Sequence, residues 1–137
     1  MTQPQAAPPN ADEYKSFVDM LGTEMVERAD GRSKVRMAIR PRHMQGAGVV
    51  QGGLLMALAD QAISSALGSL SPGLPVVTIE MKVNFIAPAR DGVLLGEGRI
   101  THRGNLISVG EATITDDKGR LILLAVGTWM TPRPPAR

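Results

Sequence analysis

One long segment of the chain is apolar on nearly all sides, and the segments that follow it alternate between apolar and polar residues. The apolar segment runs from Gly52 to Leu70, and in its first half almost every residue is apolar. This pattern predicts a helix that is buried on most of its surface. The sequence Ser71-Pro72-Gly73 predicts its end, because Pro and Gly both break helices.

Four strands are predicted after this helix. From Val77 to Phe85, apolar and polar residues alternate with a period of two, as they do in a half-buried strand. Three more strands lie between turn-forming residues, over 93–102, 106–115 and 120–130. Before the helix, the turn Ala29-Asp30-Gly31 separates two strands over 23–28 and 34–39, and a Gly-rich loop extends from residue 41 to 50. A short helix capped by Asn10 or Asp12 is predicted to end near Leu21.

These elements predict an α+β fold. Consecutive strands on short loops are antiparallel neighbours or near neighbours, so one long helix should face one curved antiparallel sheet. The last strand is apolar on both faces, whereas a sheet with one face on a helix should be polar on the other. Its two rows are Leu121, Leu123, Ala125 and Ile122, Leu124, Val126. We therefore expect another subunit to cover the second face.

The length of 137 residues indicates one domain. Residues 1–10 are rich in Pro, Gln and Ala and predict a loose arm, residues 11–130 form the domain, and residues 131–137 form a tail. With 43% hydrophobic and 20% charged residues, the chain can build an ordinary core. The absence of Cys excludes a disulfide framework, a thiolate nucleophile and a Cys-ligated metal.

Charge and targeting signals narrow the possible partners. The net charge of +2 gives no dense basic cluster that would favour nucleic acid. The first residues lack the basic and apolar regions of a secretory signal, and no apolar run is expected to be long enough to span a membrane. We expect a cytoplasmic protein with neither a nucleic-acid nor a membrane partner.

Several kinds of active site are poorly supported. His43 and His102 lie far apart, without metal-ligand spacing, and both are expected to be solvated. No G-x-S-x-G sequence supports a serine hydrolase. The stretch Gly46-Ala47-Gly48 continues without the third Gly of a dinucleotide-binding loop. The sequence therefore predicts no metal and no cofactor.

Asp60 is the strongest candidate for chemistry. It is the only charged residue between Arg42 and Glu80, and it lies within the apolar helix. A buried carboxylate is costly unless it is paired or hydrogen-bonded, so its presence needs a reason. A structural alternative stays open, because the spacing also places Asp60 on a polar stripe with Gln61, Ser64 and Ser65.

The start of the helix offers a second reactive feature. Backbone N–H groups at Gln51-Gly52-Gly53 are free and partially positive, and the Gly52 N–H could polarise a carbonyl oxygen as an oxyanion hole does. Asp60 lies eight residues further on, about 12 Å along the helix. A dimer that places Asp60 opposite Gly52 of the partner subunit could bring the two together. The alternative is that these Gly residues only allow close helix packing.

Two regions together resemble the hotdog-fold acyl-CoA thioesterases of the 4-hydroxybenzoyl-CoA thioesterase superfamily, most closely the phenylacetate-degradation type. The first is Gln45 to Gly53 with its continuation to Asp60, and the second is Thr78 to Arg90, followed by Arg103-Gly104 and residues 117–120. The resemblance implies a hotdog fold, in which an antiparallel sheet wraps a long central helix. It also implies hydrolysis of an aryl- or medium-chain acyl-CoA without a cofactor, by a homodimer or a homotetramer built from two dimers.

The resemblance also implies roles for individual residues. Asp60 would be the nucleophile or the general base, the Gly52 N–H would hold the thioester oxygen, and Gln45 would bind near the carbonyl or the water. Ser64 and Thr78 match positions that orient water or the carboxylate. The implied substrate-binding residues are Gln51, Gly53, Arg90, Arg103, Gly104 and Asn105, with the Arg side chains near the phosphates of coenzyme A.

Gln51 departs from the family pattern, which has His at this position. A Gln amide forms hydrogen bonds but is neither an acid nor a base near neutral pH. A non-catalytic acyl-CoA binder or sensor is therefore the main alternative. A hotdog dehydratase would need a His–carboxylate pair that no motif here supplies, and a purely structural module would be insensitive to the loss of the Asp60 carboxylate.

Overall fold

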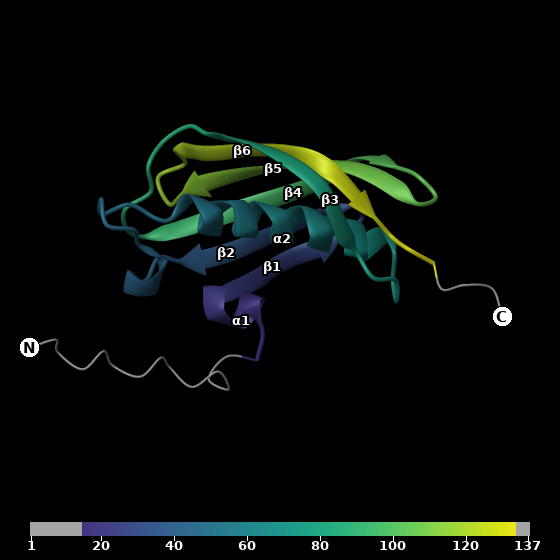
Figure 1. Ribbon diagram of the computed structural model, residues 1–137, viewed down its shortest axis with the longest axis horizontal. Helices are drawn as coiled ribbons and strands as arrows, with labels where there is room; N and C mark the ends of the chain where they lie inside the picture. The colour runs from purple at the N-terminus through teal and green to yellow at the C-terminus, as the bar shows by residue number, and fades with distance from the viewer. Residues whose placement is uncertain (1–14, 134–137) are drawn as a thin grey trace, which may run out of the picture.

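The computed structural model describes residues 15–133, and its elements form one sheet that curves around one long helix (Figure 1). In chain order they are α1 (Phe17–Leu21), β1 (Thr23–Ala29), β2 (Arg32–Ala38), the 3-10 turn η1 (Pro41–His43), α2 (Gly52–Leu70), β3 (Val77–Phe85), β4 (Val93–Arg103), β5 (Ile107–Asp116) and β6 (Leu121–Met130). The predicted α+β hotdog architecture is confirmed, and the predicted strand limits agree to within two residues.

The six strands are all antiparallel, in the order β1-β2-β4-β5-β6-β3. β3 and β4 follow each other in the chain but do not pair, because β3 joins the far edge of the sheet beside β6 and β4 returns to pair with β2. Among the described strands, β3 and β1 therefore form the two edges. An edge strand leaves one row of backbone groups available for another chain.

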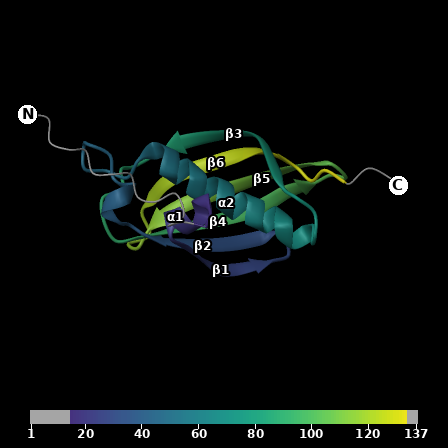
Figure 2. The ribbon, with the colours of Figure 1, turned by 60° about the horizontal axis from the view of Figure 1, so that its bottom comes forward.

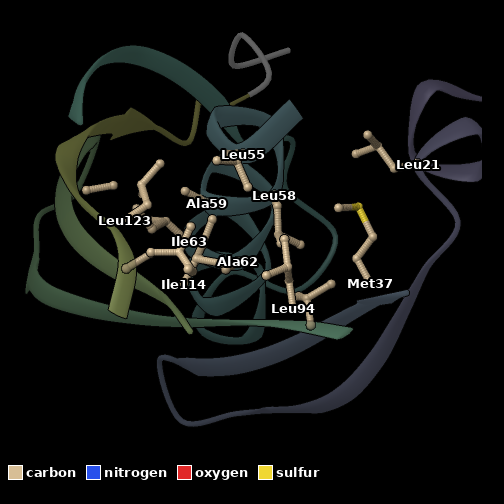
Figure 3. Packing of buried hydrophobic residues seen from close by; sticks show 14 of the residues in the cluster. Leu21, Met37, Leu55, Leu58, Ala59, Ala62, Ile63, Leu94, Ile114 and Leu123 are labelled. Atoms are coloured by element: carbon tan, nitrogen blue, oxygen red, sulfur yellow. The ribbon is translucent and has the colours of Figure 1, made fainter. Parts of the chain in front are cut away.

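α2 lies across the concave face of the sheet, where its buried side carries most of the core (Figures 2 and 3). Gly98 on β4 allows this close approach, because a Cβ there would collide with the backbone at Ala62 and Ile63. The Ser33 hydroxyl donates a hydrogen bond to the Ala62 carbonyl at 2.5 Å. Figure 3 shows Leu58, Ala62 and Ile63 pointing from the helix toward the strands. These contacts fix α2 along β4.

Within the described residues, the short helix α1 begins at Phe17, later than predicted. Ser16 caps it, with its Oγ accepting a hydrogen bond from the Asp19 N–H at 3.1 Å. Asn10 and Asp12, the predicted caps, lie outside the described residues, as does the predicted arm over 1–10. The predicted end at Leu21 is confirmed, and Gly22 stops the helix in a left-handed conformation.

The expectation that no apolar segment is long enough to span a membrane was wrong for α2. By length and composition, with a mean hydropathy of 1.2, Gly52–Leu70 is apolar enough to cross a membrane. Its inner side packs on the sheet of the same chain, and a core helix passes the same test, so this property is weak evidence for a membrane span.

The outer face of the sheet, opposite α2, carries exposed apolar side chains. Leu124 is 40% exposed and Val126 is 44% exposed. From Leu123 onward the two rows of β6 differ within one chain: Leu123 and Ala125 are buried in the core, while Leu124 and Val126 face outward. Ile122, at the start of the strand, is fully buried although it belongs to the same row as Leu124. The expectation that another subunit covers this outer face stays a prediction.

Candidate active site

Asp60 is half-buried, and two donors hold one of its carboxylate oxygens. The Thr78 hydroxyl donates to Asp60 Oδ1 at 2.7 Å, and the Trp129 ring Nε1–H donates to the same oxygen at 3.1 Å. Among the described residues, no hydrogen bond is made to the second oxygen, Oδ2. The carboxylate is therefore oriented through one oxygen, while the other can act on a ligand or a water molecule.

Trp129 is a site residue that the sequence reasoning missed. It is the only Trp of the chain and is fully buried. Trp129 pairs with Thr78 across the β3–β6 ladder, so neighbouring positions on two strands present their donors to the same carboxylate. A buried indole N–H usually finds an acceptor. The sequence did contain a signal for this contact, namely a single Trp that needs an acceptor and a single carboxylate, Asp60, in an apolar helix. That signal could be used only once the pairing of β3 with β6 was known.

The first turn of α2 presents free backbone donors. Leu54 and Leu55 both donate to the Gln51 carbonyl, at 3.0 and 3.3 Å. Within the part of the chain that the structure describes, the Gly52 and Gly53 N–H groups have no acceptor. Gly52 also lies against the Phe85 ring, since a Cβ on Gly52 would be 3.3 Å from Phe85 Cζ.

Gln45 folds the loop that leads to this helix. Its side-chain Oε1 accepts a hydrogen bond from the Ala47 N–H at 2.6 Å, and its backbone N–H donates to the Val49 carbonyl at 2.8 Å. Gln45 and Gly52 line a cavity of about 330 Å³ that Phe85 also borders. The structure thus brings Gln45 and Gly52 together, with the Gln45 carbonyl oxygen committed to the loop and its Nε2 facing no partner among the described residues.

Asp60 and Gly52 do not meet within one chain. Asp60 lines a separate groove of about 410 Å³, which shares no lining residue with the Gly52 cavity. Eight residues of helix separate the two, or about 12 Å. Ser64 lies one turn beyond Asp60 in the same groove, with Gln61 and Ser65. The polar stripe of Asp60, Gln61, Ser64 and Ser65 therefore exists. Asp60 differs from the other three because its carboxylate accepts hydrogen bonds from two side chains.

The two Arg expected near coenzyme A lie at opposite ends of α2. Arg90 Nη1 donates to the Gly48 carbonyl at 3.4 Å, close to the start of the helix. Arg103 Nη1 donates to the carbonyl of Leu70, the last residue of α2, at 2.5 Å. The helix has 19 residues, or about 28 Å. One chain by itself does not bring both Arg to the same nucleotide.

The remaining substrate-binding candidates divide between the same two ends. Gln51 and Gly53 are exposed beside Gly52. Gly104 and Asn105 lie in the turn between β4 and β5, next to Arg103. The Gly104 N–H donates to the Ile107 carbonyl at 3.0 Å, and a Cβ on Gly104 would collide with that carbonyl. Gly104 is therefore required by the turn itself.

The expectation that His43 is solvated was wrong, because the residue is only 1% exposed. Its Nδ1 accepts a hydrogen bond from the Arg40 N–H at 3.0 Å, and its carbonyl accepts from the Gln51 N–H at 2.9 Å. Burial lowers the pKa of His43, the nearby charges of Arg42 and Arg40 lower it further, and the Leu21 backbone acts in the opposite direction. His43 anchors the residue that precedes α2. His102 is exposed, as expected.

One antiparallel sheet that curves around one long central helix is the hotdog fold. Residues 47–123 match the family model of the thioesterase superfamily. The chain belongs to this superfamily.

Individual relatives agree with this assignment. A putative esterase of Archaeoglobus fulgidus is 31% identical over 118 residues, covering 84% of this chain and 75% of that protein. The 1,4-dihydroxy-2-naphthoyl-CoA hydrolase of Listeria monocytogenes is 27% identical over 108 residues, covering 78% of this chain and 88% of that protein. The Escherichia coli PaaI protein from the phenylacetic acid degradation operon has the same fold, with a TM-score of 0.79 and 24% identity, covering 85% of this chain and 83% of that chain.

Proposed function

We propose that this protein hydrolyses an acyl-CoA thioester at a site shared by two subunits, with the Asp60 carboxylate from one and the Gly52 N–H from the other. Neither group suffices alone: the carboxylate needs an electrophilic carbonyl, and the N–H supplies no nucleophile. The match to the thioesterase superfamily supports the reaction class, and the naphthoyl-CoA hydrolase among the relatives supports coenzyme A as the thiol.

The geometry of β3 is the observation that carries this proposal. Asp60 accepts a hydrogen bond from Thr78, the second residue of β3, whereas Gly52 lies against Phe85, the last residue of β3. If the free edges of two β3 strands pair in antiparallel fashion around a two-fold axis, the start of one strand lies beside the end of the other. Asp60 then lies opposite Gly52 of the partner subunit.

The edge of β3 is suited to such pairing. In one chain, β3 pairs only with β6 among the described strands. Large apolar side chains along and just beyond β3 are about half exposed, namely Val77 at 45%, Ile79 at 50%, Phe85 at 53% and Ile86 at 52%. An unpaired edge with exposed apolar residues favours association with another chain. A homodimer is therefore the smallest complete unit of the proposal, and pairing of dimers through the exposed Val126 face would make a homotetramer.

The same dimer brings the two Arg together. In antiparallel α2 helices with Asp60 opposite Gly52 of the partner subunit, each C-terminus extends past the start of the other helix. Arg90, at the start of one α2, then lies on the same side as Arg103 of the partner subunit. Arg side chains pair well with phosphate, so these two Arg are candidates to hold the phosphates of coenzyme A.

The chemistry follows from these positions. The Gly52 N–H would polarise the thioester carbonyl and hold the oxyanion that forms on it. Asp60 Oδ2 either takes a proton from water, whose oxygen attacks the carbonyl carbon, or attacks that carbon itself to form an anhydride that water then hydrolyses. In both routes the C–S bond breaks, coenzyme A leaves as the thiolate and takes up a proton, and the free acid is released. The proposal involves no metal and no cofactor, and places the enzyme in the cytoplasm.

Release of free thiol from a panel of aryl- and alkyl-CoA thioesters, measured for wild type and for Asp60→Asn, tests this function. We expect turnover that falls by about 10²–10⁴-fold in the variant, the usual effect of losing a positioned base. Asn keeps the size and an oxygen that can accept from Thr78 and Trp129. If the wild type binds the esters tightly but releases no thiol, the protein is an acyl-CoA binder, and Gln51 in place of the family His becomes the first explanation.

A further inference from the structure

The groove that contains Asp60 runs along the solvent side of α2. It has a volume of about 410 Å³ and extends from Ala57 to Ser71, between α1 and the loop that follows α2. At the helical rise, these two residues lie about 21 Å apart along the axis. A groove of this length suits a linear chain that starts at the carboxylate.

The charges of the groove lie at separate positions. Among its lining residues, Asp60 is the only acidic one and Arg28, from β1, is the only basic one. Arg28 forms no ion pair with any described residue. The groove therefore offers a negative group at its start and an uncompensated positive group further along.

Arg28 is held in place by the helix. Its Nε donates to the Ser65 carbonyl at 3.2 Å, and a Cβ on Gly68 would lie 2.5 Å from Arg28 Nη2. Any side chain larger than Gly at position 68 would displace the guanidinium. Since one N–H donates to Ser65 and an Arg side chain has five, four remain for a ligand of the groove that Arg28 lines.

Ser71 adds a second donor at the same end. It is 3% exposed, it lines the groove, and its Oγ has no hydrogen-bond partner among the described residues. The Ser71 N–H donates to the Gly68 carbonyl at 3.3 Å, so Ser71 lies three residues beyond Gly68, on which the Arg28 guanidinium rests. A buried hydroxyl without a partner is costly, and a ligand acceptor would satisfy it.

We propose that Arg28 and Ser71 determine acyl specificity by binding a carboxylate at the far end of a medium-length linear acyl group, so that the preferred substrates are ω-carboxyacyl thioesters of coenzyme A. This inference rests on the proposed hydrolase function. Ser65 and Gly68 lie five and eight residues beyond Asp60, or about 8–12 Å along the helix. That distance separates the thioester from the distal carboxylate.

A purely structural role for Arg28 makes a different prediction. Arg103 donates to the last carbonyl of α2 without lining the groove, and cationic side chains near a helix C-terminus stabilise the helix. If Arg28 did only this, its loss would affect every substrate alike. The ratio of activities on two esters that differ only at the chain end distinguishes the two roles.

The test compares kcat/KM for suberyl-CoA and octanoyl-CoA, which have chains of equal length ending in a carboxylate and a methyl group. Wild type should prefer suberyl-CoA. Arg28→Gln should lower that preference about tenfold by its effect on suberyl-CoA alone, as expected for a charge-assisted bond at a partly exposed site. Arg28→Lys should restore part of it, Ser71→Ala should lower it less, and Arg103→Gln should leave the ratio unchanged.

Two results would overturn the inference: a wild type that prefers octanoyl-CoA, or an Arg28→Gln variant that loses activity equally on both esters. If wild type hydrolyses neither ester, the groove is tested by calorimetric binding of the same two esters, and the proposed function fails only if no other thioester of the panel is hydrolysed. Tighter binding of suberyl-CoA that is lost in Arg28→Gln would still support the carboxylate site, and equal affinities would refute it.

Discussion

Subunit complementation tests directly whether the active site is shared. The two changes are Asp60→Asn, which removes the carboxylate, and Gly52→Pro, which removes the proposed oxyanion donor. Pro is tolerated at the first position of a helix. Gln51 already has φ −56° and ψ 129°, the extended conformation favoured before Pro. The helix should therefore persist, with the Phe85 ring shifting slightly where it contacts the new ring.

The expected magnitudes follow from the geometry. Each variant homodimer lacks one component at both sites, so Asp60→Asn should lose about 10²–10⁴-fold and Gly52→Pro about 10²–10³-fold. In a mixed dimer, one site carries both changes and the other carries neither. With random assortment, half of the dimers are mixed and half of their sites are intact, so co-produced subunits should regain roughly a quarter of wild-type activity before the mixed dimers are isolated, and about half afterwards.

The assay is thiol release by co-produced chains that carry different affinity tags, after sequential purification on both tags. Co-production of Asp60→Asn with Asp60→Ala is the matched control, because no arrangement of these two chains has an intact site. If the purified Asp60→Asn and Gly52→Pro mixed dimers are no more active than their parents, while each variant keeps the circular dichroism of wild type, the shared site is refuted.

Two further changes probe how the site is held. Thr78→Val removes the 2.7 Å hydrogen bond to Asp60 while the side chain keeps nearly the same shape. A hydrogen bond to a charged group contributes about 1.5–3 kcal/mol, and this value is discounted here because the site is partly exposed. In steady-state thiol release we therefore expect kcat to fall about tenfold with KM little changed, and an unchanged kcat would contradict the orienting role. Burial lowers the pKa of His43 from its ordinary 6.5, so the folded protein binds this proton less well than the unfolded chain does. The free energy of unfolding that is present above pH 6.5 should therefore decline as the pH falls toward the lowered pKa. Urea unfolding at pH 8 and pH 5 should show this loss in wild type and less of it in His43→Asn, whose amide oxygen can accept from Arg40, while the same change at exposed His102 should leave the pH dependence unaltered.

The sequence by itself determined the elements and the main candidate. Gly52–Leu70 and Val77–Phe85 have the limits that their apolar patterns predicted, because period and turn residues act locally. Asp60 stood out for the same reason, as the single charge in an apolar helix. The family pattern further pointed to Gly52, Gln45 and Thr78. The hydrogen bond from Thr78 to Asp60 supports the orienting role proposed for Thr78, which stays a prediction.

Tertiary structure decided which distant residues meet. No local pattern indicated that β3 would join β6 and so bring Trp129 to Asp60, that η1 would bury His43, or that Arg28 would rest on Gly68. Each of these depends on the order of the strands and on how closely the helix approaches the sheet. Those features arise from packing the whole core at once, since hydrophobic burial is non-directional and the same alternating pattern fits more than one strand order.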